Sequence, residues 1–224
     1  MIKGLYIHIP FCRHICGYCD FARALYSSRA ADHYLDHLEK ELLTIGQSAF
    51  STAYIGGGTP SALSEEQLER LLKMVNRFDI KGEYTIEINP ETLTLEKALL
   101  MKQYGINRVS LGIQSFNEKL LEYMERSHRN IDVVMAMKYL DQAGIKNRSI
   151  DLMYGFADQT VGMLLDDLEK AVRMDVTHIS IYDLEIHPNT LFGIRKYRKL
   201  DEETDGIMYQ TIIDYRSEEH TSEL

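Results

Sequence analysis

The sequence alternates between short runs rich in β-branched and aromatic residues and longer stretches with helical periodicity. The short runs predict strands at residues 4–9, 52–56, 83–88, 108–113, 149–154 and 178–184. The longer stretches predict helices at residues 30–48, 64–77, 94–104, 130–144 and 160–174, with a sixth beginning near Asp201. Strict alternation of strands and helices builds right-handed βαβ units on a parallel sheet, so an α/β fold is expected.

Within the predicted strands, apolar and polar residues also alternate. In the first strand Leu5, Ile7 and Ile9 alternate with Tyr6 and His8, and the later strands repeat the pattern. Buried parallel strands usually form continuous apolar runs, so one face of this sheet is expected to pack under helices and the other to line a polar lumen. In α/β barrels the site lies at the carboxyl ends of the strands.

Composition and charge narrow the class of protein. The chain has 224 residues, is 45% hydrophobic and carries a formal net charge of −9, with no run of Lys or Arg longer than a pair. Such a charge repels nucleic acid, and a nucleic-acid partner is not expected. No apolar stretch approaches the roughly 20 residues needed to cross a bilayer, and the N-terminus has no signal-peptide pattern, so we expect a cytoplasmic protein without stable membrane insertion.

All three cysteines lie in one short segment, with the spacing Cys12-x3-Cys16-x2-Cys19. An odd number of cysteines in one loop is a poor disulfide framework and indicates metal binding. Thiolates at this spacing can hold three corners of a cubane iron–sulfur cluster, which leaves one iron open for S-adenosylmethionine. The alternative is a zinc site completed by His8 or His14 in a barrel of unrelated activity.

The segment YIHIPFCRHICGYCDF, from Tyr6 to Phe21, resembles the radical S-adenosylmethionine enzymes, and specifically the HemN/HemW branch of haem metabolism. The resemblance continues through GGGTP at 56–60, EINP at 87–90, NRVSLGIQSF at 107–116, RSH at 126–128 and DLMYG at 151–155. It implies a partial (β/α)6 barrel of the TIM type, open on one side, that holds a 4Fe-4S cluster and S-adenosylmethionine.

The same resemblance implies roles for individual residues. Cys12, Cys16 and Cys19 would bind the cluster. Tyr6, Gly57, Gly58 and Thr59 would lie around the methionine group, Glu87 would bind the ribose hydroxyls, and Gln114, Arg126 and Asp151 would contact the adenosine or the methionine carboxylate. Each also has a simpler interpretation, because a glycine run can be only a turn, Arg126 a solvated helix charge and Asp151 a partner of a neighbouring strand.

Phe21 selects between two functions within the branch. In the resembling coproporphyrinogen III dehydrogenases the cysteine motif is longer and has a fourth cysteine two places after the third. This chain has Phe21 at that position. The sequence therefore predicts a haem chaperone, with oxidative decarboxylation of coproporphyrinogen as the alternative. Expected partners are haem or a porphyrinogen and a low-potential electron donor. Two departures from the branch stand out, namely Phe156-Ala157-Asp158 in place of a Pro-containing turn and Glu125 where a Gly commonly precedes the Arg.

The last nine residues, RSEEHTSEL at 216–224, equal the in-frame translation of a common sequencing adapter. We therefore expect a radical S-adenosylmethionine core domain at 1–215, cut short at its C-terminal end, an artefact at 216–224, and no C-terminal HemN-type domain in this chain. Haem binding would then belong to the full-length protein.

Overall fold

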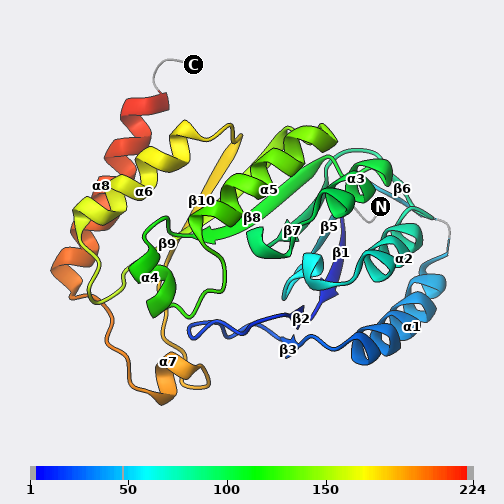
Figure 1. The fold of residues 1–224 in the computed structure, drawn as a ribbon, viewed down its shortest axis with the longest axis horizontal. Coiled ribbons are helices and arrows are strands. Elements are labelled where there is room, and N and C mark those ends of the chain that lie inside the picture. Colours follow the sequence, from blue (N-terminus) through cyan, green and yellow to red (C-terminus); the bar gives the residue numbers. More distant parts are fainter. Residues whose placement is uncertain (1–3, 47, 221–224) are drawn as a thin grey trace.

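The core of the molecule is one parallel sheet of six strands (Figure 1). The computed structural model describes residues 4–46 and 48–220, and of residues 216–220 only the backbone. The strand order is β1-β5-β7-β8-β9-β10, and every neighbouring pair is parallel. The strands are β1 (Gly4–Ile9), β5 (Thr52–Gly57), β7 (Tyr84–Ile88), β8 (Arg108–Gln114), β9 (Asn147–Tyr154) and β10 (His178–Asp183). All six predicted strands are confirmed.

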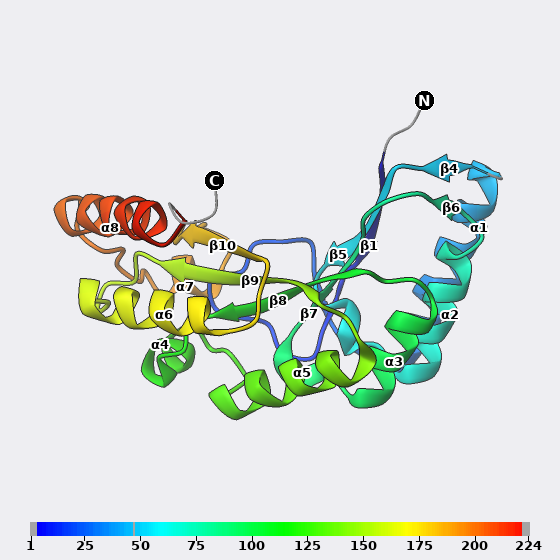
Figure 2. The ribbon, with the colours of Figure 1, turned by 90° about the horizontal axis from the view of Figure 1, so that it is seen from above.

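Helices connect successive strands and cover the outer side of the curved sheet (Figure 2). They are α1 (Ser28–Ile45), α2 (Glu65–Val75), α3 (Leu95–Gln103), α5 (Asn130–Ala143) and α6 (Val161–Arg173), followed by α8 (Glu202–His220). Their starts follow the capping signals, because the side chains of Ser64 and Thr94 accept hydrogen bonds from the first turns of α2 and α3. Gly144 ends α5 in the left-handed conformation. The predicted helices are confirmed, although the first ends at Ile45 and not at residue 48, and residue 47 lies outside the described residues.

Several short elements were not predicted. They are the helices α4 (Glu118–Tyr123) and α7 (Leu191–Ile194), the 3₁₀ turns η1 (Pro60–Ala62) and η2 (Pro90–Thr92), and two small ladders that join β2 (Phe11–Cys12) to β3 (Ala24–Leu25) and β4 (Ala49–Phe50) to β6 (Asp79–Ile80). Segments of two to six residues carry too little periodicity to stand out in a sequence. Contacts with the rest of the fold hold them in place.

The two faces of the sheet divide as the alternation indicates. Ile7, Ile86 and Leu111 belong to the buried core beneath the helices. On the other face, Glu87 and Asp151 line a cavity. Fully burying a large aliphatic side chain contributes about 1.5–3 kcal/mol, so the helix-facing residues hold the fold together while the opposite face is left for polar groups.

β1 and β10 end the strand order, and among the described residues they do not pair with each other. The sheet is therefore a partial barrel that is open on one side, as expected. In the described part of the chain, no helix is both long and apolar enough to cross a membrane. The backbone of residues 216–220 continues α8, and residues 221–224 of the expected artefact lie outside the described residues.

Candidate functional site

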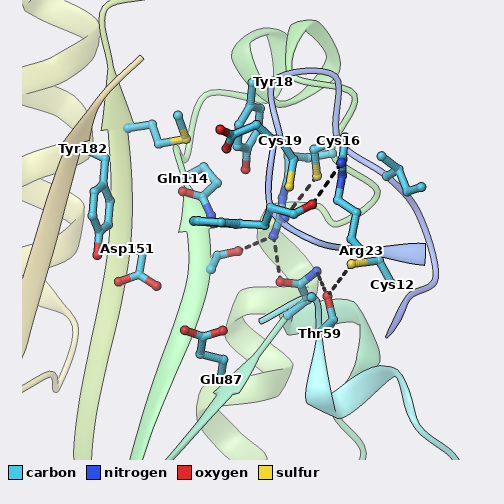
Figure 3. A pocket seen from close by; sticks show the side chains of 18 of the residues that line it. Cys12, Cys16, Tyr18, Cys19, Arg23, Thr59, Glu87, Gln114, Asp151 and Tyr182 are labelled. Carbon is cyan, nitrogen blue, oxygen red and sulfur yellow. Dashed lines mark hydrogen bonds between the residues drawn. The ribbon is translucent and has the colours of Figure 1, made fainter. Parts of the chain in front are cut away.

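A cavity of about 750 Å³ lies at the carboxyl ends of the strands (Figure 3). It is lined by every residue that the sequence analysis assigned to the site except Tyr6. The Tyr6 ring stacks on that of Tyr54 with centroids 6.1 Å apart, and its hydroxyl lies 3.0 Å from Nδ1 of His8. Tyr6 is therefore connected to the site through Tyr54 and does not line the cavity.

The cysteine loop, residues 12–23 between β2 and β3, is held over this cavity by backbone hydrogen bonds on both sides. The ladder of β2 with β3 closes the loop at its base, where Tyr26 N–H donates to the Cys12 carbonyl at 2.8 Å. At the tip, Gly17 N–H donates to the Met124 carbonyl at 3.1 Å, and the Gly17 carbonyl accepts from Phe192 N–H at 2.9 Å. The loop is thus attached to the segment after α4 and to α7, elements distant from it in sequence.

The three thiols are unbridged and face the same cavity. Thr59 donates its hydroxyl hydrogen to Cys12 Sγ at 3.5 Å, and Arg126 Nη1 donates to Cys16 Sγ at 3.4 Å. Burial raises the pKa of Cys12 and of Cys19, although nearby donors and arginines oppose the shift. Because a metal binds the thiolate form, cluster assembly should release protons from these thiols.

The donor set fits a cluster better than a single zinc ion. A structural zinc needs four ligands around one point, yet the described residues contain no group of three or more His, Cys, Asp and Glu side chains placed to hold one ion. His8 is already occupied, since Nδ1 contacts the Tyr6 hydroxyl and Nε2 lies 2.8 Å from the Ala22 carbonyl. In a cubane each thiolate binds a different iron, so the thiolates lie farther apart than around one ion.

The glycine loop, residues 56–58 at the end of β5, packs directly against the cysteine loop. A Cβ on Gly58 would lie 2.8 Å from the carbonyl carbon of Pro10 and 3.0 Å from Cys12 Sγ. Gly57 has a φ of +116°, in the region that favours glycine. These positions need glycine for close approach, which goes beyond the interpretation of the run as a plain turn.

Glu87 connects this loop to the sheet. Its two carboxylate oxygens accept hydrogen bonds from the Tyr54 hydroxyl at 2.6 Å and from Gly57 N–H at 2.9 Å. Both oxygens thus have a protein partner, and a carboxylate has further lone pairs for a hydroxyl-bearing ligand.

Asp151 is held by the neighbouring strand and also lines the cavity. Ser110 Oγ lies 3.3 and 3.2 Å from its two carboxylate oxygens. Burial raises the pKa of Asp151 to about 6, repulsion by Glu87 adds to the shift, and hydrogen bonds from Ser110 and Ser180 oppose it. A carboxyl group with a shifted pKa in a cavity is typical of a binding or catalytic site.

Gln114 and Arg126 reach the cavity through irregular backbone. Gln114 has a φ of +68°, and the pairing of β8 with β9 shifts register between Gly112 and Gln114. Such a bulge redirects the side chain at a strand end. The interpretation of Arg126 as a solvated helix charge is wrong, because Arg126 lies beyond the end of α4 and its guanidinium donates to Cys16, Asn89 and the Gly112 carbonyl.

The two departures from the branch leave the local structure intact. Gln159 Oε1 accepts from Gly155 N–H at 2.9 Å, and Gln159 N–H donates to the Phe156 carbonyl at 2.8 Å, so the turn closes without a proline. Phe156 itself is buried.

Glu125 has a φ of +56°, which explains why glycine suits this position. Its carboxylate pairs with Arg195 Nη1 at 2.7 Å. Glu125→Gly would relieve backbone strain of about 1 kcal/mol but lose a partly exposed ion pair of about 0–1 kcal/mol. We expect the free energy of unfolding to change by less than about 1 kcal/mol, measured by chemical denaturation. A loss above about 2 kcal/mol would contradict this account of the strain.

Some site residues escaped the sequence analysis. Asn89, Ser110 and Tyr182 all line the cavity. Asn89 lies within the quoted EINP segment, and Ser110 and Tyr182 belong to the polar face of their strands, so the alternation pattern was the signal that could have identified them.

Comparison with known proteins agrees with this geometry. The sequence matches the model of the Radical SAM superfamily over residues 6–171, and the chain belongs to this superfamily. Among curated proteins it is similar to Heme chaperone HemW of Bacillus subtilis, with 42% identity over 200 residues, covering 85% of this chain and 52% of the relative. HemW of Escherichia coli is 38% identical, with coverage of 86% and 53%.

A solved structure shows the same architecture. The coproporphyrinogen III oxidase HemN of Escherichia coli superposes with a TM-score of 0.88 at 25% identity, covering 97% of this chain and 52% of that chain. The chain thus spans about half the length of these relatives. The superfamily implies a 4Fe-4S cluster and S-adenosylmethionine.

Proposed function

We propose that this chain is the cluster- and S-adenosylmethionine-binding part of a haem chaperone of the HemW kind. The observation that carries the proposal is the meeting of three unbridged thiols with the glycine loop and Glu87 around one cavity. The HemW relatives supply the assignment to haem handling. A cytoplasmic location and a low-potential electron donor belong to the same proposal.

In this proposal Cys12, Cys16 and Cys19 would hold the cluster, and S-adenosylmethionine would bind beside it in the same cavity. The bound pair supplies one-electron chemistry at the sulfonium. The protein's own residues bind and orient S-adenosylmethionine. Gly57 and Gly58 allow close backbone approach, Glu87 accepts from ribose hydroxyls, and the cysteine loop covers the cavity.

Coproporphyrinogen oxidation is the second candidate, favoured by the similarity to HemN. Phe21 counts against it, because the cysteine pattern of the coproporphyrinogen oxidases has a fourth cysteine at this position.

Anaerobic reconstitution with iron and sulfide tests the proposed site. We expect close to four irons and four sulfides per chain, and S-adenosylmethionine binding that perturbs the spectrum of the reduced cluster. Replacing Cys12, Cys16 or Cys19 by serine should abolish stable loading, whereas the matched control Ser28→Ala on the surface helix α1 should load normally. One zinc per chain without sulfide would disprove the cluster.

A full-length relative with the same Phe21 motif separates the two functions. Under reducing conditions it should bind haem and transfer it to an apo-haem protein, without converting coproporphyrinogen. Formation of protoporphyrinogen would replace the chaperone assignment by the oxidase.

A further inference from the structure

Asn89 lies between the two side chains that donate to cysteine sulfurs. Its Nδ2 donates to Thr59 Oγ1 at 3.3 Å, and its Oδ1 accepts from Arg126 Nη2 at 3.2 Å. Thr59 in turn donates to Cys12 Sγ and Arg126 to Cys16 Sγ. Figure 3 shows Thr59 directed at Cys12 from the loop after β5. One amide therefore connects the partners of two thiols.

We propose that Asn89 is a positioning residue that aims hydrogen bonds at two cluster ligands and thereby sets the reduction potential of the cluster. This inference rests on the proposed function, because it needs a cluster on the cysteines. Hydrogen bonds to cluster sulfurs and nearby charge are among the factors that set such potentials.

The chemistry of the amide explains the choice of residue. A threonine hydroxyl has one hydrogen to donate and accepts at its oxygen. Because Asn89 donates to Thr59, the hydroxyl hydrogen of Thr59 stays available for Cys12. The opposite end of the amide must accept, since the guanidinium of Arg126 only donates. A residue with one donor and one acceptor on a short rigid group satisfies both neighbours at once.

A closed ring of hydrogen bonds fixes the Asn89 backbone. Asn89 N–H donates to Ser61 Oγ at 3.1 Å, and Thr92 Oγ1 donates to the Asn89 carbonyl at 2.9 Å. The Thr92 hydrogen is then used, so Ser61 donates to Thr92 and the ring closes. Pro90 follows directly and restricts Asn89 to the extended conformation.

A buried lysine donates hydrogen bonds to the backbone of two residues of this ring. Lys97 Nζ donates to the Ser61 carbonyl at 2.8 Å and to the Thr92 carbonyl at 3.0 Å. Both the η1 and η2 turns are thereby tied to α3. The two turns that carry Thr59 and Asn89 toward the cysteines thus form one hydrogen-bonded unit.

Asn89→Asp changes the hydrogen-bond direction with little change in shape. A carboxylate only accepts, so Thr59 would turn its hydrogen to Asp and leave Cys12 without a donor. The added negative charge also lowers the midpoint potential of the cluster. We expect a more negative midpoint potential, seen as a severalfold smaller reduced fraction at a fixed potential in anaerobic redox titrations followed by electron paramagnetic resonance.

Three further single variants and one double variant isolate the mechanism. Asn107→Asp makes the same chemical change at the amino end of β8, remote from the cavity, and should leave the potential unchanged. Thr59→Val removes the Cys12 donor directly and should shift the potential as Asn89→Asp does. In the double variant the shifts should sum to less than the two single shifts, because both remove the same hydrogen bond. Asn89→Leu, which adds no charge, should give a smaller negative shift.

Iron content and thermal unfolding of each variant show that it is folded and loaded. Full additivity of Asn89→Asp and Thr59→Val, or equal shifts in Asn89→Asp and Asn107→Asp, would overturn the inference. If Asn89→Asp assembles no cluster, Asn89→Leu and Thr59→Val decide, and unchanged potentials in both would overturn it. If the unmodified chain holds no cluster, the proposed function fails instead.

Discussion

Asp151→Asn is expected to stabilise the ligand-free protein by about 1–3 kcal/mol at pH 7 and by almost nothing near pH 4. Burial first, and then repulsion by Glu87, raises the folded pKa of Asp151 to about 6 from its ordinary value of 3.8. Between these values the folded state binds the proton more tightly than the unfolded state. Stability therefore falls as pH rises from about 4 to about 6 and stays reduced above that range.

Asparagine is neutral at every pH, so it avoids the cost of a buried carboxylate while keeping nearly the same shape. The measurement is the free energy of unfolding from urea titrations at pH 7 and pH 4 for both proteins. An equal stability difference at the two pH values would contradict the raised pKa as the cause.

Asp141 provides a control of opposite sign. Hydrogen bonds from Lys146 and Arg148 lower the pKa of Asp141 to about 2. The folded state therefore favours the charged form, and the stabilisation is lost as pH falls toward that value. Asp141→Asn should destabilise the protein at pH 7, with a difference that fades in acid. The ionised carboxylate lowers the stability of the folded protein at Asp151 but raises it at Asp141. A residue that lowers stability fits one retained for ligand binding.

The layers of the fold could be predicted because the sequence encodes them locally. Strands such as Thr52–Gly57 and helices such as Val161–Arg173 have their own periodicity and caps, and the predicted strands match the observed ones within two residues at each end. The alternation of apolar and polar residues also predicted which face lines the cavity. What it could not predict were elements such as α7, which depend on packing against the cysteine loop.

The sequence predicted which residues line the cavity better than it predicted how they contact one another. The motifs brought together the cysteines, the glycine loop and the strand-end polar residues in one cavity. The contacts of Arg126 with Cys16 and Asn89 depend on a backbone path that no local pattern encodes. The bulge at Gln114 is equally invisible, because a register shift is set by the pairing with β9. Tyr6 is the one predicted site residue that does not line the cavity, and its ring stacks on that of Tyr54.

Gly58→Ala should lower the free energy of unfolding by about 1–3 kcal/mol and reduce cluster loading. A Cβ at this position would lie 2.8 Å from the Pro10 carbonyl carbon and 3.0 Å from the Ile9 carbonyl oxygen. These are backbone atoms of the segment that leads into β2, and Gly58 N–H already donates to the Ile9 carbonyl at 2.8 Å. The two chains would have to separate, which would move Cys12.

Gly206→Ala is the matched control, because a Cβ at that helix position meets no atom within 4 Å. It should stabilise α8 by about 0.5–1 kcal/mol, since alanine restricts the unfolded chain more than glycine does. Urea unfolding of the ligand-free variants measures the first effect, and iron per chain after reconstitution measures the second. Normal loading of Gly58→Ala would show that the position of Cys12 tolerates displacement, and close packing of the two loops would then not be a requirement for the cluster.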